Sequence, residues 1–362
     1  MIVVDAHEDL AWNALTFGRD YTLSVVETRS RESGKEAPQH NGHTLLGWPE
    51  WVRGRVALVF ATLFAAPARK KEGAWDTQCY DTVEGAHQLY RNSLDYYLRL
   101  EGEHPDKFRR ILSQTDLEQH LGEWEGERLD EPKVGLVILM EGADGVRDPM
   151  ELPEWFDAGV RILGPAWSGT RYAGGTGEPG PLTDEGRALL EVMAELGMIL
   201  DVSHMAEEGV LEAVDRYDGA LIASHCNPLA RLPHSAKPER HLSDWSIARI
   251  AEREGVIGVV LANHFLKDGW TASEGRQAVT LDEVAAHIDH ICQVVGDVEH
   301  VGLGSDFDGG FGLDKIPLGL DSVADLRLIG DRLSARGYRP GEVDDVLGGN
   351  WLSVLRRALP EG

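Results

Sequence analysis

Short apolar runs alternate with amphipathic stretches along most of the chain. Eight runs are rich in valine, isoleucine and leucine, with little alternation between apolar and polar positions. This pattern is typical of strands that are buried on both faces of a parallel sheet. The predicted strands are Ile2–Val4, Val56–Thr62, Val134–Met140, Val160–Leu163, Met198–Val202, Ala220–Ala223, Val256–Leu261 and Val301–Gly304.

The stretches between these runs have the periodicity of helices that bury one face. The clearest predicted helices are Tyr80–Leu100, Thr183–Leu196, Ala206–Arg216, Ser243–Glu254, Leu281–Val295 and Ser322–Ala335. Thr183 and Ser243 provide a hydroxyl at a helix start, and Thr280 with Glu283 fits a capping box. Gly197 is a suitable residue to end a helix before the next strand.

Strands that alternate with helices in a chain of 362 residues predict an α/β fold, a (β/α)8 TIM barrel. A doubly wound open sheet is the alternative, but it requires a glycine-rich phosphate loop after an early strand, and the sequence has none there. No Pro/Ser-rich linker divides the chain, so we expect a single domain over residues 1–362, with closing helices at residues 340–359. We expect Gly18–Trp51 and Ala173–Pro181 to be long loops over the barrel mouth.

Candidate chemistry begins at the first run, which ends in His7-Glu8-Asp9. On an extended backbone, side chains two positions apart point the same way, so His7 and Asp9 can reach one point in space. An imidazole and a carboxylate suit a divalent metal, above all zinc. His-x-Asp alone is a weak signal, and the other strand ends decide its meaning.

Four more runs end in a residue that can bind metal. Glu141 follows the third run, His204 the fifth, His225 the sixth and Asp306 the eighth. Taken alone, each of these residues can also be interpreted as purely structural, since a histidine often ends a strand and Glu141 can cap a helix. Together, three histidines and three carboxylates at strand ends converge on the barrel mouth. Burying unpaired carboxylates there is costly, which favours a binuclear metal site.

The remaining histidines and the cysteine beside His225 are interpreted as residues that do not bind metal. They include His40, His43, His87, His104, His120, His287, His290 and Cys226.

Charge and composition limit the classes of partner that the protein can bind. The chain has 35 basic and 61 acidic residues, a net charge of −26, which argues against nucleic acid and anionic membranes as partners. No run of about 18 apolar residues occurs that could span a membrane. Three scattered cysteines and the absence of signal-peptide and lipid-anchor patterns lead us to expect a reduced, cytoplasmic protein.

These motifs resemble the membrane (renal) dipeptidase family of zinc metallopeptidases, within the amidohydrolase superfamily. The resemblance covers essentially the whole chain. It is carried by Asp5-Ala-His-Glu-Asp-Leu10, Glu141-Gly, Leu182-Thr-Asp-Glu-Gly186, Leu196-Gly-Met-Ile-Leu-Asp-Val-Ser-His204, Ser224-His225, Val301-Gly-Leu-Gly-Ser-Asp-Phe-Asp-Gly309 and Gly348-Gly-Asn-Trp351.

The resemblance implies a role for each site residue. His7 and Asp9 would hold one Zn²⁺ ion, His204 and His225 the other, and Glu141 would bridge the two. It further implies a zinc-dependent dipeptidase that cuts the amide bond of dipeptides by attack of a metal-bridging hydroxide.

Two more roles and an assembly follow from the same resemblance. Asp306 would be the catalytic proton-transfer group, and Arg240, in Glu239-Arg-His-Leu-Ser-Asp244, would bind the terminal carboxylate of the substrate. The resemblance also implies a homodimer. A surface position is the alternative for Arg240.

The sequence departs from the family at two positions. Trp167 stands where the family carries a histidine that contacts the substrate, and tryptophan donates one hydrogen bond but accepts no proton. Glu8 replaces a common asparagine and is expected to face away from the metals. The alternatives are therefore a divergent amidohydrolase for another carboxylate-bearing amide, such as an N-acyl amino acid, and a non-catalytic barrel that binds a small ligand.

Overall fold

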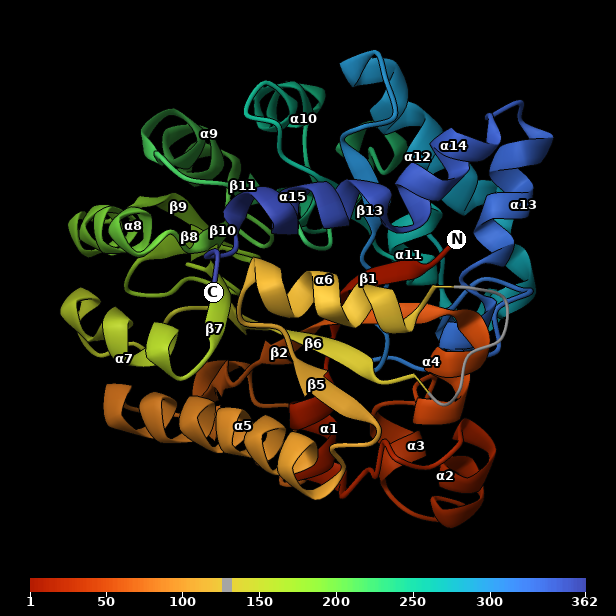
Figure 1. Cartoon of the computed structure of the whole chain (residues 1–362), viewed down its shortest axis with the longest axis horizontal. Coiled ribbons are helices and arrows are strands. Elements are labelled where there is room, and N and C mark those ends of the chain that lie inside the picture. Colours follow the sequence, from red (N-terminus) through yellow and green to blue (C-terminus); the bar gives the residue numbers. More distant parts are fainter. Residues whose placement is uncertain (126–131) are drawn as a thin grey trace.

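The computed structural model describes residues 1–125 and 132–362 and confirms the predicted barrel. Neighbouring strands are parallel and follow one another in chain order around a ring (Figure 1). A bridge between Ala223 and Ile257 joins the last pair and closes the ring, so the open-sheet alternative is wrong. The barrel strands are β1 (Val3–Glu8), β2 (Val56–Leu63), β6 (Val134–Glu141), β7 (Val160–Gly164), β10 (Ile199–Asp201), β11 (Leu221–Ile222), β12 (Ile257–Val259) and β13 (Val301–Leu303).

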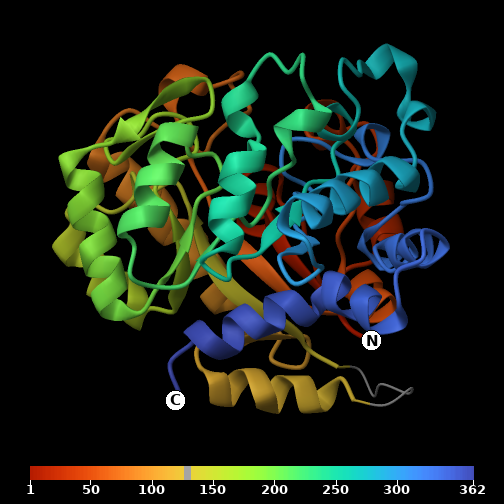
Figure 2. The ribbon, with the colours of Figure 1, turned by 90° about the horizontal axis from the view of Figure 1, so that it is seen from above.

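The inside of the barrel is a packed apolar core. Side chains such as Val4, Phe60 and Leu139 fill it and have no exposure to solvent. At the end where the strands begin, α15 (Asn350–Ala358) covers this core and lies beside α6 (Gln114–Glu123) (Figure 2). Trp351 of α15 donates a hydrogen bond from Nε1 to the carbonyl of Leu303 at 3.0 Å. A Cβ at Gly302 would lie 2.3 Å from this nitrogen, so the close packing requires glycine.

Helices form the outer ring of the barrel (Figure 1), and the predicted caps are present. Thr183 accepts from the backbone of Gly186, and Thr280 forms a capping box with Glu283. The remaining helices are α1 (Leu10–Phe17), α2 (Val25–Arg31), α3 (Ala37–His40), α4 (Trp48–Gly54), α5 (Val83–Glu103), α7 (Leu152–Asp157), α8 (Asp184–Leu196), α9 (Glu207–Arg216), α10 (Asp244–Ala251), α11 (Asn263–Leu266), α12 (Leu281–Val295), α13 (Leu328–Ala335) and α14 (Pro340–Asp344).

Both loop predictions are wrong in their secondary structure. Gly18–Trp51 contains α2 and α3 and the start of α4, because Ser24 and Glu27 form a capping box that starts α2. Ala173–Pro181 lies in a hairpin of β8 (Ala173–Gly175) and β9 (Glu178–Leu182). Gly177, at φ 74°, lies in its two-residue turn. Three short strands lie beside the barrel: β3 (Ala66–Pro67), β4 (Cys79–Tyr80) and β5 (Phe108–Arg110).

A buried carboxylate holds the segment of α2 and α3 against the mouth of the barrel. Asp308, just after β13, accepts hydrogen bonds from the hydroxyls of Tyr21 at 2.9 Å and Thr44 at 2.7 Å and from the backbone of Leu45 at 2.9 Å. Arg19 pairs with the same carboxylate at 2.9 Å. A buried charge with this many partners fixes the position of the segment.

Within residues 1–125 and 132–362, none of the helices combines the length and the apolar character that crossing a membrane requires.

Candidate metal centre

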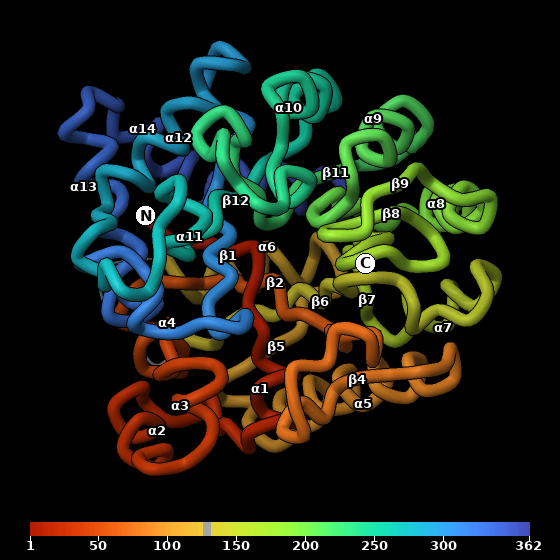
Figure 3. Tube along the Cα trace, turned by 180° about the vertical axis from the view of Figure 1, so that it is seen from behind, coloured from red at the N-terminus to blue at the C-terminus, as the bar shows by residue number. Residues whose placement is uncertain are grey.

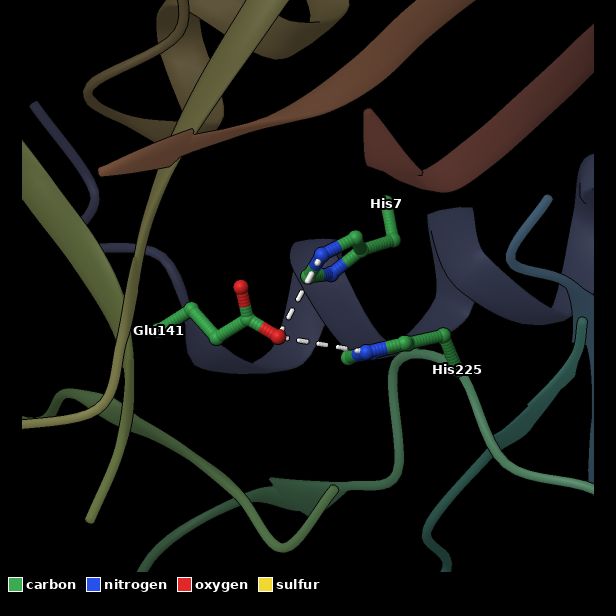
Figure 4. Close-up of side chains that lie close together, drawn as sticks. All are labelled: His7, Glu141 and His225. Carbon is green, nitrogen blue, oxygen red and sulfur yellow. Dashed lines mark ion pairs between the residues drawn. The ribbon is translucent and has the colours of Figure 1, made fainter. Parts of the chain in front are cut away.

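Three imidazoles surround one carboxylate oxygen at the mouth of the barrel. Glu141 comes from the end of β6, and its Oε1 lies 3.6 Å from Nε2 of His7 and 3.3 Å from Nε2 of His225 (Figure 4). The rings of His7 and His225 stack with centroids 3.6 Å apart. His204 completes the group, with Nε2 at 3.0 Å from the same oxygen. Residues far apart in the sequence meet here because parallel strands end at one rim.

The backbone of His204 is held in an uncommon conformation. His204 has φ 65°, in the left-handed region that non-glycine residues seldom adopt. In this conformation, Nε2 of His204 lies 2.9 Å from Nε2 of His225. Residues in such conformations cluster at functional sites, where the surrounding structure holds them in place.

Hydrogen bonds behind the rings fix which nitrogen faces the centre. Ser224 donates its hydroxyl proton to Oδ2 of Asp201 at 2.5 Å, so it acts as an acceptor toward Nδ1 of His225 at 2.8 Å. With the proton of His225 on Nδ1, the lone pair of Nε2 points toward Glu141. The hydroxyl of Ser224 also lies 3.4 Å from Nδ1 of His7. One serine therefore orients two of the three imidazoles.

Two further polar side chains support the remaining groups. Thr176, in the turn between β8 and β9, has its Oγ1 2.9 Å from Nδ1 of His204. Thr62, near the end of β2, donates to Oδ1 of Asp9 at 2.5 Å. Each of these bonds leaves the opposite atom of the side chain free to face the centre, as supports behind metal ligands do.

The arrangement fits divalent cations. Nε2 of His7 is fully buried and has no hydrogen-bond partner among the described residues. The ligand atoms of His7, Glu141 and His225 lie within 4.8 Å of one another, and so do those of His7, Asp9 and Asp306. Imidazole nitrogens and carboxylate oxygens form the donor set that zinc prefers.

The charges at the centre depend strongly on one another. Burial favours the neutral form of His7, but Glu141 and Asp9 outweigh it and raise its pKa to about 10. Burial opposes ionisation of Glu141, yet the charge of His7 and the histidine hydrogen bonds hold its pKa well below the usual range. Burial lowers the pKa of His204 to about 4, with a contribution from Arg240. The centre thus keeps an ionised carboxylate among buried imidazoles.

Asp306 and Asp9 lie side by side at the rim. Asp306 follows β13 with φ 60°, and its backbone N–H donates to the carbonyl of His7 at 3.1 Å. Asp5 fixes the preceding residue by accepting from the backbone and the hydroxyl of Ser305, at 2.7 and 2.5 Å. A Cβ at Gly309 would lie 2.1 Å from Oδ1 of Asp306 and 2.7 Å from Oδ2 of Asp9, so glycine is needed there.

A cavity of about 300 Å³ opens above the centre and includes Asp9, Glu141, His204 and Asp306 in its lining. Arg240 also lines it and is only 3% exposed. Nη1 of Arg240 donates to the carbonyl of His225 at 2.8 Å, whereas the buried Nη2 has no partner among the residues the structure describes. An unpaired buried guanidinium nitrogen can donate to a carboxylate in this cavity.

The two positions that depart from the expected motifs have different surroundings. Trp167 lines the cavity, with its ring centroid 6.2 Å from that of His204 and 5.0 Å from that of Phe64. Glu8 is fully buried behind the centre, with both carboxyl oxygens 3.1 Å from Nε1 of Trp51. Burial and the nearby Asp5 raise the pKa of Glu8 well above its usual range. Glu8 therefore faces away from the histidine cluster.

Several residues of the site were not found from the sequence. Ser224, Asp201 and Thr176 support the imidazoles, and His40, expected only as a residue that does not bind metal, lines the cavity with Trp12. The sequence did contain one signal for Ser224, because His204 and His225 each directly follow a serine. No comparable signal marks Thr176, which a hairpin brings to the site.

Substitution of Ser224 by alanine is expected to lower the affinity for divalent metal about 10- to 100-fold, because His225 and His7 lose the acceptor that orients them. Competition with a chromogenic chelator measures this affinity. Ser93→Ala is the matched control, since the one hydrogen bond that the side chain of buried Ser93 forms with the described residues stays within its own helix, to the carbonyl of Leu89. Equal affinity in Ser224→Ala and wild type would contradict the role of Ser224.

Known proteins resemble this chain along its length. The family model described as "Membrane dipeptidase (Peptidase family M19)" matches residues 1–359. An uncharacterized protein in the pqqA 5′ region of Klebsiella pneumoniae is 36% identical over 262 residues, covering 69% of this chain and 89% of that protein. An uncharacterized dipeptidase of Schizosaccharomyces pombe is 30% identical over 229 residues, covering 61% of this chain and 53% of that protein.

A solved structure supports the same relationship. The crystal structure of dipeptidase AC, described as a metallopeptidase, superposes with a TM-score of 0.77 at 25% identity and covers 99% of both chains.

Proposed function

The chain belongs to the membrane dipeptidase family, peptidase family M19, and from this membership we propose that it is a zinc-dependent dipeptidase with two Zn²⁺ ions. The family makes it a hydrolase with divalent metal; the choice of zinc and the number of ions are our proposal. The donor set of His7, His204, His225 and three carboxylates supports zinc.

The observation that carries the proposal is that three imidazole Nε2 atoms approach one oxygen of Glu141. The cavity above this oxygen is also lined by Arg240, whose Nη2 has no partner among the described residues. In the proposed arrangement, His7 and Asp9 would hold one ion, His204 and His225 would hold the other, and Glu141 would be shared by both. When bound, two such ions supply an activated water and polarise the scissile carbonyl.

The side chains around the centre have the remaining roles in the proposed reaction. Asp306 accepts the proton of the attacking water and donates it to the leaving amine. Arg240 holds the carboxylate at the end of the substrate through its unpaired Nη2, which is a strong, directional contact in a buried site. Trp167 forms part of the wall beside His204 and limits the space around the scissile bond.

Three unpaired cysteines support a reducing, cytoplasmic location as part of the proposal, and a homodimer is the assembly we propose.

The test combines metal analysis with a panel of L,L and L,D dipeptides. Purified protein is expected to hold close to two zinc ions per chain and to hydrolyse members of the panel. Arg240→Met is expected to raise KM about 100-fold, because the substrate carboxylate loses a charge-assisted hydrogen bond. Arg231→Met, an exposed arginine of the same segment, is the control. Steady-state kinetics on each variant gives the comparison.

The alternatives have distinct outcomes in the same experiment. Metal-replete protein that cleaves no dipeptide would end the dipeptidase proposal, and activity on N-acyl amino acids would then establish another amidohydrolase. Binding of carboxylated ligands without any turnover would indicate a non-catalytic barrel. All six metal-binding and proton-transfer candidates are present in the sequence, which favours catalysis.

A further inference from the structure

The cavity has two chemically different ends. Arg240 and Lys237 line it from the segment that follows β11, whereas Trp75 and Asp76 line it from the segment that follows β2. β2 and β11 lie opposite each other in the ring of strands, so these segments face each other across the mouth. Figure 3 shows the segment after β2 in orange and the segment after β11 in green, on opposite sides. One end is therefore basic and the other aromatic and acidic.

An aromatic wall, formed by Trp12, His40 and Trp75, lines the end opposite Arg240. The ring of Trp75 stacks on His40 with centroids 4.3 Å apart and an interplanar angle of 13°. Phe17 stacks with Trp75 at 5.6 Å and 18°. Trp12 meets Trp75 edge-on, at 6.2 Å and 86°. Rings held by three separate segments form a preorganised apolar surface that favours another aromatic ring.

Two buried polar atoms at this end have no protein partner. Nε1 of Trp12 and Oδ1 of Asp76 form no hydrogen bond with any described residue, although Trp12 is only 8% and Asp76 only 5% exposed. Both residues line the cavity. A buried donor or acceptor without a partner is unfavourable, so a ligand that pairs with both atoms gains specificity here.

We propose that this end binds the side chain of the first residue of a dipeptide and selects an aromatic side chain with a hydroxyl, as in tyrosine. The inference rests on the proposed dipeptidase function, in which Arg240 holds the opposite end of the substrate. The ring of a phenol packs against the aromatic wall, and its hydroxyl donates a hydrogen bond to Oδ1 of Asp76 and accepts one from Nε1 of Trp12.

The charge distribution supports this orientation of the substrate. Asp76 and Glu72 both line the aromatic end, and they repel a carboxylate there. Lys70 also lines the cavity, but its ammonium pairs with Glu178 at 3.0 Å. The carboxylate of the substrate therefore binds Arg240, and the side chain of the first residue of the dipeptide lies at the aromatic end of the cavity.

The test compares kcat/KM for Tyr-Ala, Phe-Ala and Ala-Ala, and wild type is expected to prefer them in that order. Trp75→Leu is expected to lower the ratio of Tyr-Ala to Ala-Ala about tenfold, and Trp75→Phe is expected to restore most of it. Trp12→Phe keeps an aromatic ring but replaces the indole and removes its N–H donor, and it is expected to lower the ratio of Tyr-Ala to Phe-Ala about fivefold. Trp245→Leu, which changes a 62% exposed tryptophan on α10, is the control.

The outcomes separate this inference from the proposed function. Equal rates for the three dipeptides, or equal loss for all of them in Trp75→Leu, would overturn the aromatic subsite and leave the dipeptidase intact. Absence of any dipeptide hydrolysis would end the proposed function instead. Calorimetric binding of Tyr-Ala and Ala-Ala to wild type and Trp75→Leu would then decide the subsite, which fails if Trp75→Leu changes both affinities equally.

Discussion

Replacing Asp306 by asparagine is expected to lower kcat for amide hydrolysis about 10³-fold while the protein keeps its metal. Burial and the negative charge of Asp9 raise the pKa of Asp306 well above its usual range, although His7 and Arg240 oppose them. A carboxyl group of this kind is suited to carry a proton. Asparagine has nearly the same shape, tolerates the left-handed backbone of this position and transfers no proton.

Metal content must be measured beside turnover for each variant, because Asp306 lies in one group of candidate ligands with His7 and Asp9. Asp314→Asn, an exposed carboxylate on the same segment, is the matched control. Turnover within threefold of wild type would remove Asp306 from the proton-transfer role. Loss of metal together with turnover would show that Asp306 is a ligand.

The predicted strands coincide with the barrel strands because buried β-branched runs leave few alternatives, although β1 continues to Glu8, beyond the predicted end at Val4. Once parallel strands close into a ring, their carboxyl ends meet at one rim, so Glu141 and the strand-end histidines come together whatever the connections do. This is why the sequence predicts which side chains meet. It does not predict that all three Nε2 atoms approach a single oxygen of Glu141, since this depends on side-chain rotamers and on the backbone φ of His204.

The supports and the cavity walls were harder to predict because they depend on contacts between distant segments. Thr176 reaches His204 only because β8 and β9 pair as a hairpin, which glycines in that stretch obscured. Likewise, Trp75 stacks on His40 of α3, and Asp308 holds the segment of α2 and α3 at the rim. The periodicity of apolar residues in the sequence does not predict such contacts.

Removal of divalent metal is expected to abolish hydrolysis and to lower the melting temperature, with both restored by Zn²⁺. Asp9, Glu141 and Asp306 are each less than 9% exposed, and buried like charges without a cation repel one another. A metal that binds only the folded state also adds stability, about 4 kcal/mol when its concentration is 1,000 times Kd. Scanning calorimetry and activity assays after chelation, dialysis and stepwise zinc addition measure both effects.

Glu141→Gln is the sharpest form of this experiment. Glutamine keeps the shape of the side chain but removes the charge that all three Nε2 atoms approach, at 3.0 to 3.6 Å. The variant is expected to bind fewer than two metal ions, to lose activity by at least about 10³-fold and to gain little melting temperature from zinc. Glu154→Gln on α7, outside the cavity, controls for the substitution itself. Full zinc content with wild-type activity in Glu141→Gln would refute the shared carboxylate, because the three histidines and Asp9 would then be sufficient to hold two neighbouring cations.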